Sequence, residues 1–317
     1  MNKHDFRKFL QERNISEDQI EQFVSIAEKF EGSQSHTADG VRAFSAMLIE
    51  KGLNVLDNYR ALALYGRFLG NKEIYVAVVE LVDGVEALDN LYDKVGASVG
   101  EAQRDEIFKG IELPPLGTPS SHKPQVTQAV MARLESAVEP KTCKKLLADS
   151  LRDLRDKGFL DDRKKYHACK DLDEFLEKQG QEFMAQLEQL KKDGELFFTQ
   201  EVTAEVIEFV ASHPEVRQGV REGNVLYEAK IPYMTVEYLA ETDESLKKYY
   251  YCHCPWVRES LKAGDVQVSP TFCNCSAGFH KKRWEVIFDQ PLRAEIVESV
   301  LLGDSWCKIA IYLPEHL

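Results

Sequence analysis

The chain has 317 residues, of which 44% are hydrophobic and 29% are charged, a composition typical of a globular protein long enough for two domains. Its formal net charge of -13 argues against nucleic-acid binding, which usually needs a basic face. No run approaches the roughly 18 apolar residues of a membrane span, and the first residues lack an apolar signal segment. We therefore expect a cytoplasmic protein with neither a membrane nor a nucleic acid among its partners.

Helical periodicity dominates the first hundred residues. Apolar side chains recur at helical spacing in three stretches, residues 20–30, 41–48 and 56–69. Residues 74–81 are almost continuously apolar and fit a buried helix or a strand equally well. The pattern predicts an all-helical domain over residues 1–112.

A proline-rich segment, residues 113–124, separates this domain from the rest of the chain. It contains four of the 11 prolines, each of which lacks a backbone donor and restricts the residue before it. We expect a linker here, followed by a second domain over residues 125–317.

The second domain changes its pattern part-way. Helical periodicity continues to about residue 212, but from residue 225 apolar and polar residues alternate as in a strand. Residues 249–254 and 266–275 are β-rich, and each segment is followed by a helix-like stretch. Two further segments are typical of a hairpin, residues 292–301 and 306–313. These patterns predict an α+β fold with an antiparallel sheet in the C-terminal third.

Five of the seven cysteines lie in that third. They form two Cys-x-Cys pairs and one later residue: Cys252, Cys254, Cys273, Cys275 and Cys307. Side chains at i and i+2 of an extended segment point to the same side, so each predicted strand would present two sulfurs on one face. Thiolates are soft ligands, and four of them satisfy tetrahedral Zn²⁺. The spacing predicts that the two pairs converge, with zinc as the expected cofactor.

The same residues fit a second chemistry, in which a thiol is the nucleophile. Cys275 lies just before a predicted helix over residues 279–288, whose N-terminus favours a thiolate. His280 follows it closely in the sequence. Lys281 and Arg283 supply positive charge, either to lower the pKa of a thiol or to recognise an anionic small molecule.

Simpler interpretations compete with both chemistries. A buried cysteine can behave as a small apolar residue, and we interpret Cys143 and Cys169 in this way because they lack cysteine neighbours. Trp256 is a candidate wall of a ligand pocket and equally an ordinary core aromatic residue. Exposed basic residues are commonly just solvated.

Two motifs in the C-terminal third resemble a known family. Residues 272–279 read Phe-Cys-Asn-Cys-Ser-Ala-Gly-Phe, and residues 297–309 contain Gly-Asp-Ser-Trp-Cys. Both resemble the end of a 4-vinyl-reductase-type ligand-binding domain, and the resemblance covers residues 225–317. In the phenol-sensing members of that family, cysteines and a glutamate bind zinc. The resemblance implies three zinc ligands here: Cys275 or Cys273, Glu298, and Cys307.

This chain departs from the family's zinc site at one position. The cysteine that usually follows the glutamate by three residues is replaced by Leu301. The pair Cys252 and Cys254 could restore the ligand count from an earlier segment. No ATPase or DNA-binding module accompanies the domain, so we do not expect a transcriptional activator.

Two functions follow from these patterns. The first is a cytosolic small-molecule-binding protein with a zinc–cysteine site, and a homodimer is among its expected assemblies. The second rests on the Gly-Asp-x-x-Cys motif, which is similar to one in relatives of L-2-amino-thiazoline-4-carboxylate hydrolase and implies a hydrolase of a small non-peptide C–N bond. Its candidate catalytic residues are Cys275, Glu298 and His280, with Lys281, Arg283 and Trp256 as ligand contacts. A helical adaptor with an incidental sheet is a third hypothesis.

Overall fold

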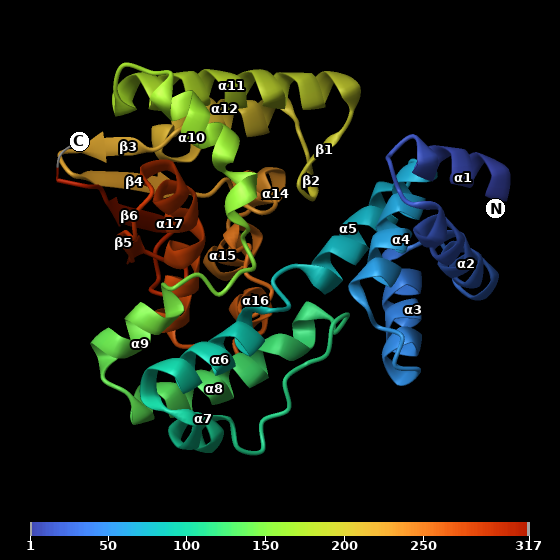
Figure 1. Ribbon diagram of the computed structural model, residues 1–317, viewed down its shortest axis with the longest axis horizontal. Coiled ribbons are helices and arrows are strands. Elements are labelled where there is room, and N and C mark those ends of the chain that lie inside the picture. The colour runs from blue at the N-terminus through green and yellow to red at the C-terminus, as the bar shows by residue number, and fades with distance from the viewer. Residues whose placement is uncertain (1, 316–317) are drawn as a thin grey trace. The chain divides into compact units, whose positions relative to one another are not determined.

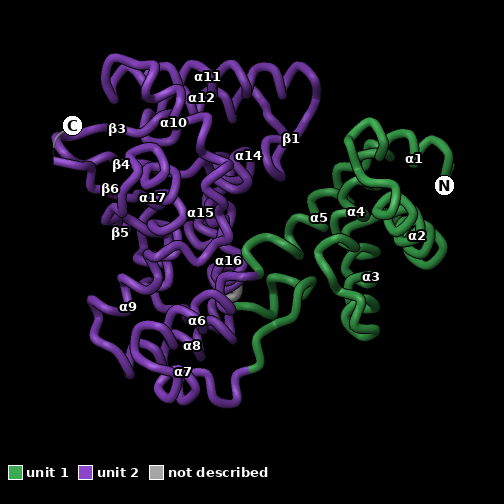
Figure 2. The backbone as a smooth tube through the Cα atoms, viewed as in Figure 1, with its two compact units in different colours: residues 1–85, 112–123 green, residues 86–111, 124–317 purple. Residues whose placement is uncertain are grey.

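The computed structural model describes residues 2–315, apart from the side chain of Ala263. Helices make up most of it, and the strands lie in its second half, so the predicted α+β class is confirmed. The backbone forms two compact units, which Figure 2 shows in different colours. Unit 1 comprises residues 1–85 and 112–123, and unit 2 comprises residues 86–111 and 124–317.

Unit 1 is a helical bundle with a short returning segment. Its helices are α1 (Lys3–Gln11), α2 (Glu17–Ser33), α3 (Ala38–Glu50), α4 (Leu56–Phe68) and α5 (Lys72–Val82), labelled in Figure 1. The side chain of Thr37 caps α3 by accepting from the N–H of Gly40, and Asn71 caps α5 by accepting from the N–H of Ile74. The cap at Asn71 begins a helix through the apolar run of residues 74–81, for which the sequence left helix and strand open.

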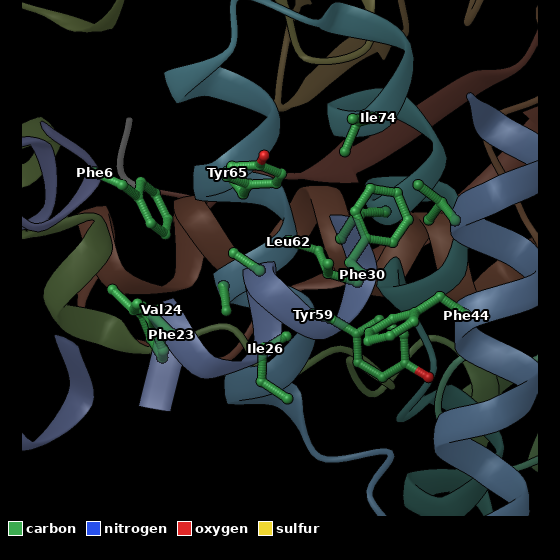
Figure 3. Packing of buried hydrophobic residues seen from close by; sticks show 14 of the residues in the cluster. Phe6, Phe23, Val24, Ile26, Phe30, Phe44, Tyr59, Leu62, Tyr65 and Ile74 are labelled. Atoms are coloured by element: carbon green, nitrogen blue, oxygen red, sulfur yellow. The ribbon is translucent and has the colours of Figure 1, made fainter. Parts of the chain in front are cut away.

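The apolar faces of these helices meet in one core, whose main residues are labelled in Figure 3. Phe23 and Phe30 of α2 share this core with Phe44 of α3 and with Tyr59 and Tyr65 of α4, and all five are fully buried. The two phenylalanines of α2 are seven residues apart, about two helical turns, so both point to the same side. Burial of each ring stabilises the unit by roughly 1.5–3 kcal/mol.

The returning segment is held against unit 1 by buried hydrogen bonds. The hydroxyl of Ser45 donates to the carbonyl of Gly117 over 2.8 Å. The carbonyl of Leu116 accepts from the amide of Asn54 over 3.1 Å and from the hydroxyl of Tyr59 over 3.3 Å. These bonds fix the proline-rich backbone to residues of α3, α4 and the loop between them, which precede it by more than fifty positions.

The compact units therefore divide the chain at different places from the predicted domains. The expected linker, residues 113–124, packs almost entirely with unit 1, whereas residues 86–111, expected in the first domain, group with unit 2. Proline content marks where helices stop, but the hydrogen bonds and contacts of the folded chain decide which unit a segment joins.

Replacing Gly117 with alanine should destabilise unit 1 by about 3 kcal/mol. Gly117 has a φ of 94°, and a Cβ there would lie 1.8 Å from the hydroxyl of Tyr59 and 2.4 Å from that of Ser45. Those two hydroxyls hydrogen bond to each other in the interior, so neither can retreat freely. Urea unfolding measures the loss.

Gly52→Ala is the matched control for this prediction. Gly52 also has a positive φ, 64°, but no atom lies within 4 Å of the added Cβ. It should cost only about 1 kcal/mol, the strain of the backbone alone. Equal losses for the two variants would contradict the role given to the returning segment.

Unit 2 contains the remaining helices and both sheets (Figure 1). Its earlier helices are α6 (Ala87–Val99), α7 (Glu101–Phe108), α8 (Lys123–Ala137, whose first residue belongs to unit 1), α9 (Pro140–Leu147), α10 (Leu160–His167), α11 (Leu172–Asp193), α12 (Ala204–Ser212) and α13 (Pro214–Arg217). Its later helices are α14 (Thr235–Ala240), α15 (Glu244–Tyr251), α16 (Arg258–Ala263) and α17 (Asn274–Phe288). The 3-10 turns are η1 (Ser120–His122) in unit 1, and η2 (Asp156–Gly158) and η3 (Pro270–Cys273) in unit 2. No helix among residues 2–315 combines the length and apolar character needed to cross a membrane.

The main sheet is antiparallel. Its strands lie in the order β3 (Val220–Glu222), β4 (Val225–Ala229), β6 (Lys308–Tyr312) and β5 (Arg293–Glu298). A separate short ladder pairs β1 (Leu196–Phe197) with β2 (Gln200–Glu201). The strand predicted from residue 225 and the C-terminal hairpin are both confirmed, because β4 and β5 pair with the two sides of β6.

Helix α17 packs against β5 and β6 of this sheet (Figure 1). Leu226 and Ile311 are register partners on adjacent strands, and both belong to one buried core with Trp284 of the helix. Phe175 of α11 meets the Trp284 ring edge-on, with centroids 6.0 Å apart. This core fixes the position of α17 relative to β4.

Two predicted strands are wrong. Residues 249–254 finish α15 and continue as a loop, and residues 266–275 lead through η3 into α17. The tyrosine run before Cys252 has strand propensity, but Asp243 caps α15 by accepting from two backbone N–H groups of its first turn. Pro270 starts η3 at a position where its missing N–H costs nothing. The cysteines therefore lie on helix ends and loops.

Candidate functional site

The C-terminal cysteines lie on loops and helix ends, and Tyr251 links the segments that carry Cys252 and Cys307. In chain order they are Cys252 and Cys254 after α15, Cys273 in η3, Cys275 in the first turn of α17, and Cys307 before β6. The buried hydroxyl of Tyr251 lies 2.9 Å from the carbonyl of Lys230, just after β4, and 3.3 Å from the carbonyl of Cys307. The end of α15 is thereby anchored beside both strand ends.

A tight turn between β5 and β6 positions Cys307. Gly303 has a φ of 105°, which favours glycine, and Asp304 closes the turn by accepting from the N–H of Ser299 over 2.8 Å. The hydroxyl of Ser299 donates to Sγ of Cys273 over 3.1 Å. Burial raises the pKa of Cys307, and the same hydroxyl acts against that rise. The Gly-Asp motif thus places one hydroxyl against two cysteines.

All five C-terminal thiols take part in electrostatic interactions with one another. Burial raises the pKa of Cys252 above its ordinary value, and the thiols of Cys254 and Cys307 raise it further. Burial likewise raises the pKa of Cys273 strongly, with additional effects from Cys307, Cys252 and Cys254. Burial and then Cys254 raise the pKa of Cys275 to about 12. Cys252 is buried, the other four C-terminal cysteines are partly exposed, and none of the five forms a disulfide.

Hydrogen-bond donors face these sulfurs. Although burial dominates, the backbone N–H of Cys254 lowers the pKa of Cys252, and the backbone N–H of Val300 lowers that of Cys307. Arg258 also lowers the pKa of Cys252. Donors of this kind stabilise a thiolate once its proton has left, as happens when a metal binds.

Two further cations lie beside Cys275. Arg152 and Lys230 both lower its pKa, against the larger effect of burial. Their charged groups also lie over the ring of Phe279, with the Arg152 guanidinium carbon 5.8 Å and the Lys230 ammonium nitrogen 5.1 Å from its centroid. Cys275 and Phe279 are four residues apart on α17 and so share a helix face.

The donor chemistry of this cluster fits zinc, but its geometry is not that of a closed site. Among residues 2–315, no group of three or more Cys, His, Asp or Glu side chains is arranged to hold a metal ion as it stands. The sulfurs would have to lie closer together to hold a metal ion. Glu298, the implied carboxylate ligand, accepts from the indole N–H of Trp306 over 2.6 Å.

A cavity of about 580 Å³ lies next to the cysteine cluster and has the size of a small-molecule site. Its wall is built by α10, α11, α13, β4 and α17. Phe279 is part of that wall, and Arg152 and Lys230, which approach the same ring, also act on Cys275. Phe279 therefore contacts the cavity on one hand and, on the other, two cations that influence Cys275.

In the cavity wall, Glu228 of β4 holds two side chains of α17. Its carboxylate lies 2.7 Å from Nδ1 of His280 and accepts from Nε1 of Trp284 over 2.9 Å. Burial alone would raise the pKa of Glu228, but the hydrogen bonds from His280 and Trp284 and the charge of Arg283 hold it below its ordinary value. An ionised carboxylate only accepts, so the proton of His280 is fixed on Nδ1.

The structure does not bring all of the predicted site residues together. The described wall of the cavity includes His280 and Arg283 but not Cys275, Glu298, Lys281 or Trp256. Arg283 contacts Asp162 at 2.7 Å, and Lys281 contacts Glu285 at 2.9 Å, so both cations already have carboxylate partners. Trp256 is 2% exposed and lies in the interior.

Sequence reasoning missed Glu228, Lys230 and Arg217, all of which belong to or adjoin the site. Glu228 and His280 are 52 positions apart, so no motif connects them. One signal was available for Glu228. It shares a face of β4 with the buried Leu226, and a charged residue at an inward position of an alternating strand calls for a buried partner.

The comparisons with known proteins cover part of this region. A family of unknown function (DUF6144) matches residues 232–317, which include all five C-terminal cysteines and His280. Glu228 and Lys230 fall outside the matched segment. No curated protein and no solved structure matches the chain.

Glu228→Gln should destabilise the protein by about 2 kcal/mol at pH 7, because an amide cannot accept from both Nδ1 of His280 and Nε1 of Trp284 as the carboxylate does. The folded-state pKa of Glu228 is depressed, so its stabilising effect is present above the unfolded value of about 4.3 and is lost as the pH falls through the folded value. Urea unfolding should show the gap between wild type and variant narrowing toward acid pH.

The control for this prediction is Glu222→Gln, an exposed position on β3. It should change stability by less than about 0.5 kcal/mol at any pH. A Glu228→Gln deficit that stays constant between neutral and acid pH would mean that the carboxylate is not ionised in the folded protein.

Proposed function

We propose that the protein is a cytoplasmic small-molecule-binding protein whose C-terminal cysteines hold a zinc ion beside the ligand cavity. The observation that carries the proposal is that four thiols from separate positions of the chain interact with one another in unit 2. The best supported ligands are Cys252, Cys254, Cys273 and Cys307, because the principal thiol neighbours of this set lie within the set. A bound zinc would cross-link the loops that carry them.

Charge balance supports the same assignment. Four thiolates around Zn²⁺ carry a net charge of about -2, which is costly to bury without compensation. Arg258 faces Cys252, and Lys230 faces Cys307, so positive charge already lies beside the proposed ligands. In the absence of a metal, the same cations would face neutral thiols.

The proposal predicts one zinc ion per chain in protein purified without an affinity tag or chelator. Elemental analysis should give that ratio for wild type and for Cys169→Ser, because Cys169 lies in the helical region and donates to the carbonyl of Lys165. Cys273→Ser and Cys307→Ser should each lower zinc occupancy at least tenfold in a competition with a chromogenic chelator.

Wild-type protein without stoichiometric zinc, which also fails to bind added zinc, would refute the metal site. So would equal zinc loss in Cys169→Ser and the two cluster variants. Should the cluster variants fold poorly, the thermal midpoint of wild type with and without chelator decides the matter, because zinc removal must lower it if zinc links the loops.

The Glu228–His280 pair favours a second function, hydrolysis of a small C–N bond. A carboxylate that fixes one imidazole nitrogen leaves the other available as a general base for water. Nε2 of His280 is buried and has no hydrogen-bond partner among residues 2–315. Under this alternative, L-2-amino-thiazoline-4-carboxylate should be turned over, and His280→Gln should lower kcat at least a hundredfold. Absence of turnover by zinc-loaded wild type at millimolar substrate would exclude this substrate and the alternative built on it.

A further inference from the structure

We propose that the cavity binds a small carboxylic acid that also carries a hydroxyl or amine hydrogen. Arg217 takes the carboxylate, and Nε2 of His280 accepts the hydrogen. This ligand class deepens the proposed function and rests on it for the existence of a bound small molecule. It moves anion recognition from Arg283 and Lys281, the residues that the sequence suggested, to a different element of the fold.

The carboxylates of the cavity wall are already matched. Each contacts a cation or an imidazole, in the pairs Asp162–Arg283, Glu182–Lys165, Glu215–Lys308 and Glu228–His280. A cationic ligand would have to compete with these partners for its counter-charge. Because Arg283 is already paired with Asp162, it is not free to bind an anionic ligand.

Arg217, the last residue of α13, differs from Arg283 because it has no carboxylate partner in the described part of the chain. Its Nε donates to the side-chain oxygen of Gln218 over 3.0 Å, and one terminal nitrogen donates to the carbonyl of Ala211 over 3.1 Å. Both acceptors are neutral, and among residues 2–315 Arg217 forms no ion pair. A guanidinium has five N–H donors in a planar fork, so donors remain for a carboxylate.

His280 supplies the complementary group. Its side chain is 12% exposed, and Nδ1 is committed to Glu228. Nε2 is shielded from solvent and has no partner in the described part of the chain. A buried acceptor without a partner is destabilising, and a ligand hydroxyl or amine would satisfy it. With its hydrogen on Nδ1, the ring accepts at Nε2, so the matching ligand group is a donor.

Apolar side chains complete the wall. Phe159, Phe183 and Phe279 line the same cavity, and aromatic surfaces of this kind contact the hydrophobic part of a ligand. A carboxylate, a donor and an aromatic body therefore define the probe. Two compounds carry the donor at different distances from the carboxylate, namely 3-phenyllactate and 4-hydroxyphenylacetate.

The test measures binding of these two acids to the full-length, zinc-replete protein by ligand-observed NMR and calorimetry. Each acid is compared with its methyl ester, which lacks the anion, and with its parent without the hydroxyl, 3-phenylpropionate or phenylacetate. We expect at least one acid to bind, its ester to bind at least tenfold more weakly, and its deoxy parent at least fivefold more weakly. Arg217→Gln should weaken the acid at least tenfold and leave the ester unchanged.

Arg293→Gln is the control, because Arg293 lies on β5 with its side chain 64% exposed and outside the described cavity wall. It should bind like wild type. The comparisons among ligands use wild-type protein alone, so they remain decisive if Arg217→Gln folds poorly. Failure of both acids to bind at 10 mM, equal binding of acid and ester, or unchanged acid binding by folded Arg217→Gln would each overturn the proposal.

Failure here is distinguishable from failure of the metal site. Zinc content measured on the same samples reports on the cysteine cluster, and acid binding reports on the cavity. Stoichiometric zinc without acid binding would refute the ligand class alone. Acid binding without zinc would refute the metal site and leave the cavity proposal standing.

Discussion

The buried carboxylate of Glu228 is the interaction on which the arrangement of unit 2 depends. It joins the inner face of β4 to α17 at two points, His280 and Trp284, in the wall of the cavity. A buried charge is costly unless it is fully hydrogen-bonded, so this carboxylate selects one orientation of the helix over others. Because Cys275 opens the same helix and Phe279 lies one turn later, that orientation also places the thiols relative to the cavity.

The cysteine cluster is built in a different way from the cavity. The cavity wall consists of helices and a strand, whereas most of the thiols lie on loops held by a few hydrogen bonds, chiefly those of Tyr251 and Ser299. Loops of this kind can adjust when a metal draws sulfurs together, and a helix packed on a sheet cannot. The two places share one helix, because Phe279 of the cavity wall lies one turn after Cys275 on α17.

The sequence predicted those parts of the fold that local patterns control. Spacing of Phe23, Phe30 and Tyr65 indicated the helices of unit 1, and alternation from Val225 indicated β4. It failed where a local cap competed with propensity, as at Asp243, which makes a helix of a tyrosine-rich segment. Nothing in the sequence indicated that the predicted linker is hydrogen-bonded to Ser45 and Tyr59, which precede it by more than fifty residues.

The candidate site was partly accessible to sequence reasoning for the same physical reasons. The concentration of cysteines can be seen from the sequence alone. The structure brings Cys252, Cys254, Cys273 and Cys307 within electrostatic range of one another. The partners that give the site its charge, Glu228 and Lys230, come from β4 and have no spacing relation to the cysteines. Such long-range pairs are set by strand register and helix packing, which one sequence does not reveal.

X-ray absorption at the zinc edge of the purified protein tests the central claim most directly, because it counts and identifies the atoms bound to the metal. The account predicts a first shell of four sulfur atoms at about 2.3 Å, with no nitrogen or oxygen neighbour. A shell dominated by nitrogen or oxygen at about 2.0–2.1 Å would show that any zinc bound lies elsewhere, and the cysteine cluster would then have to be explained without a metal.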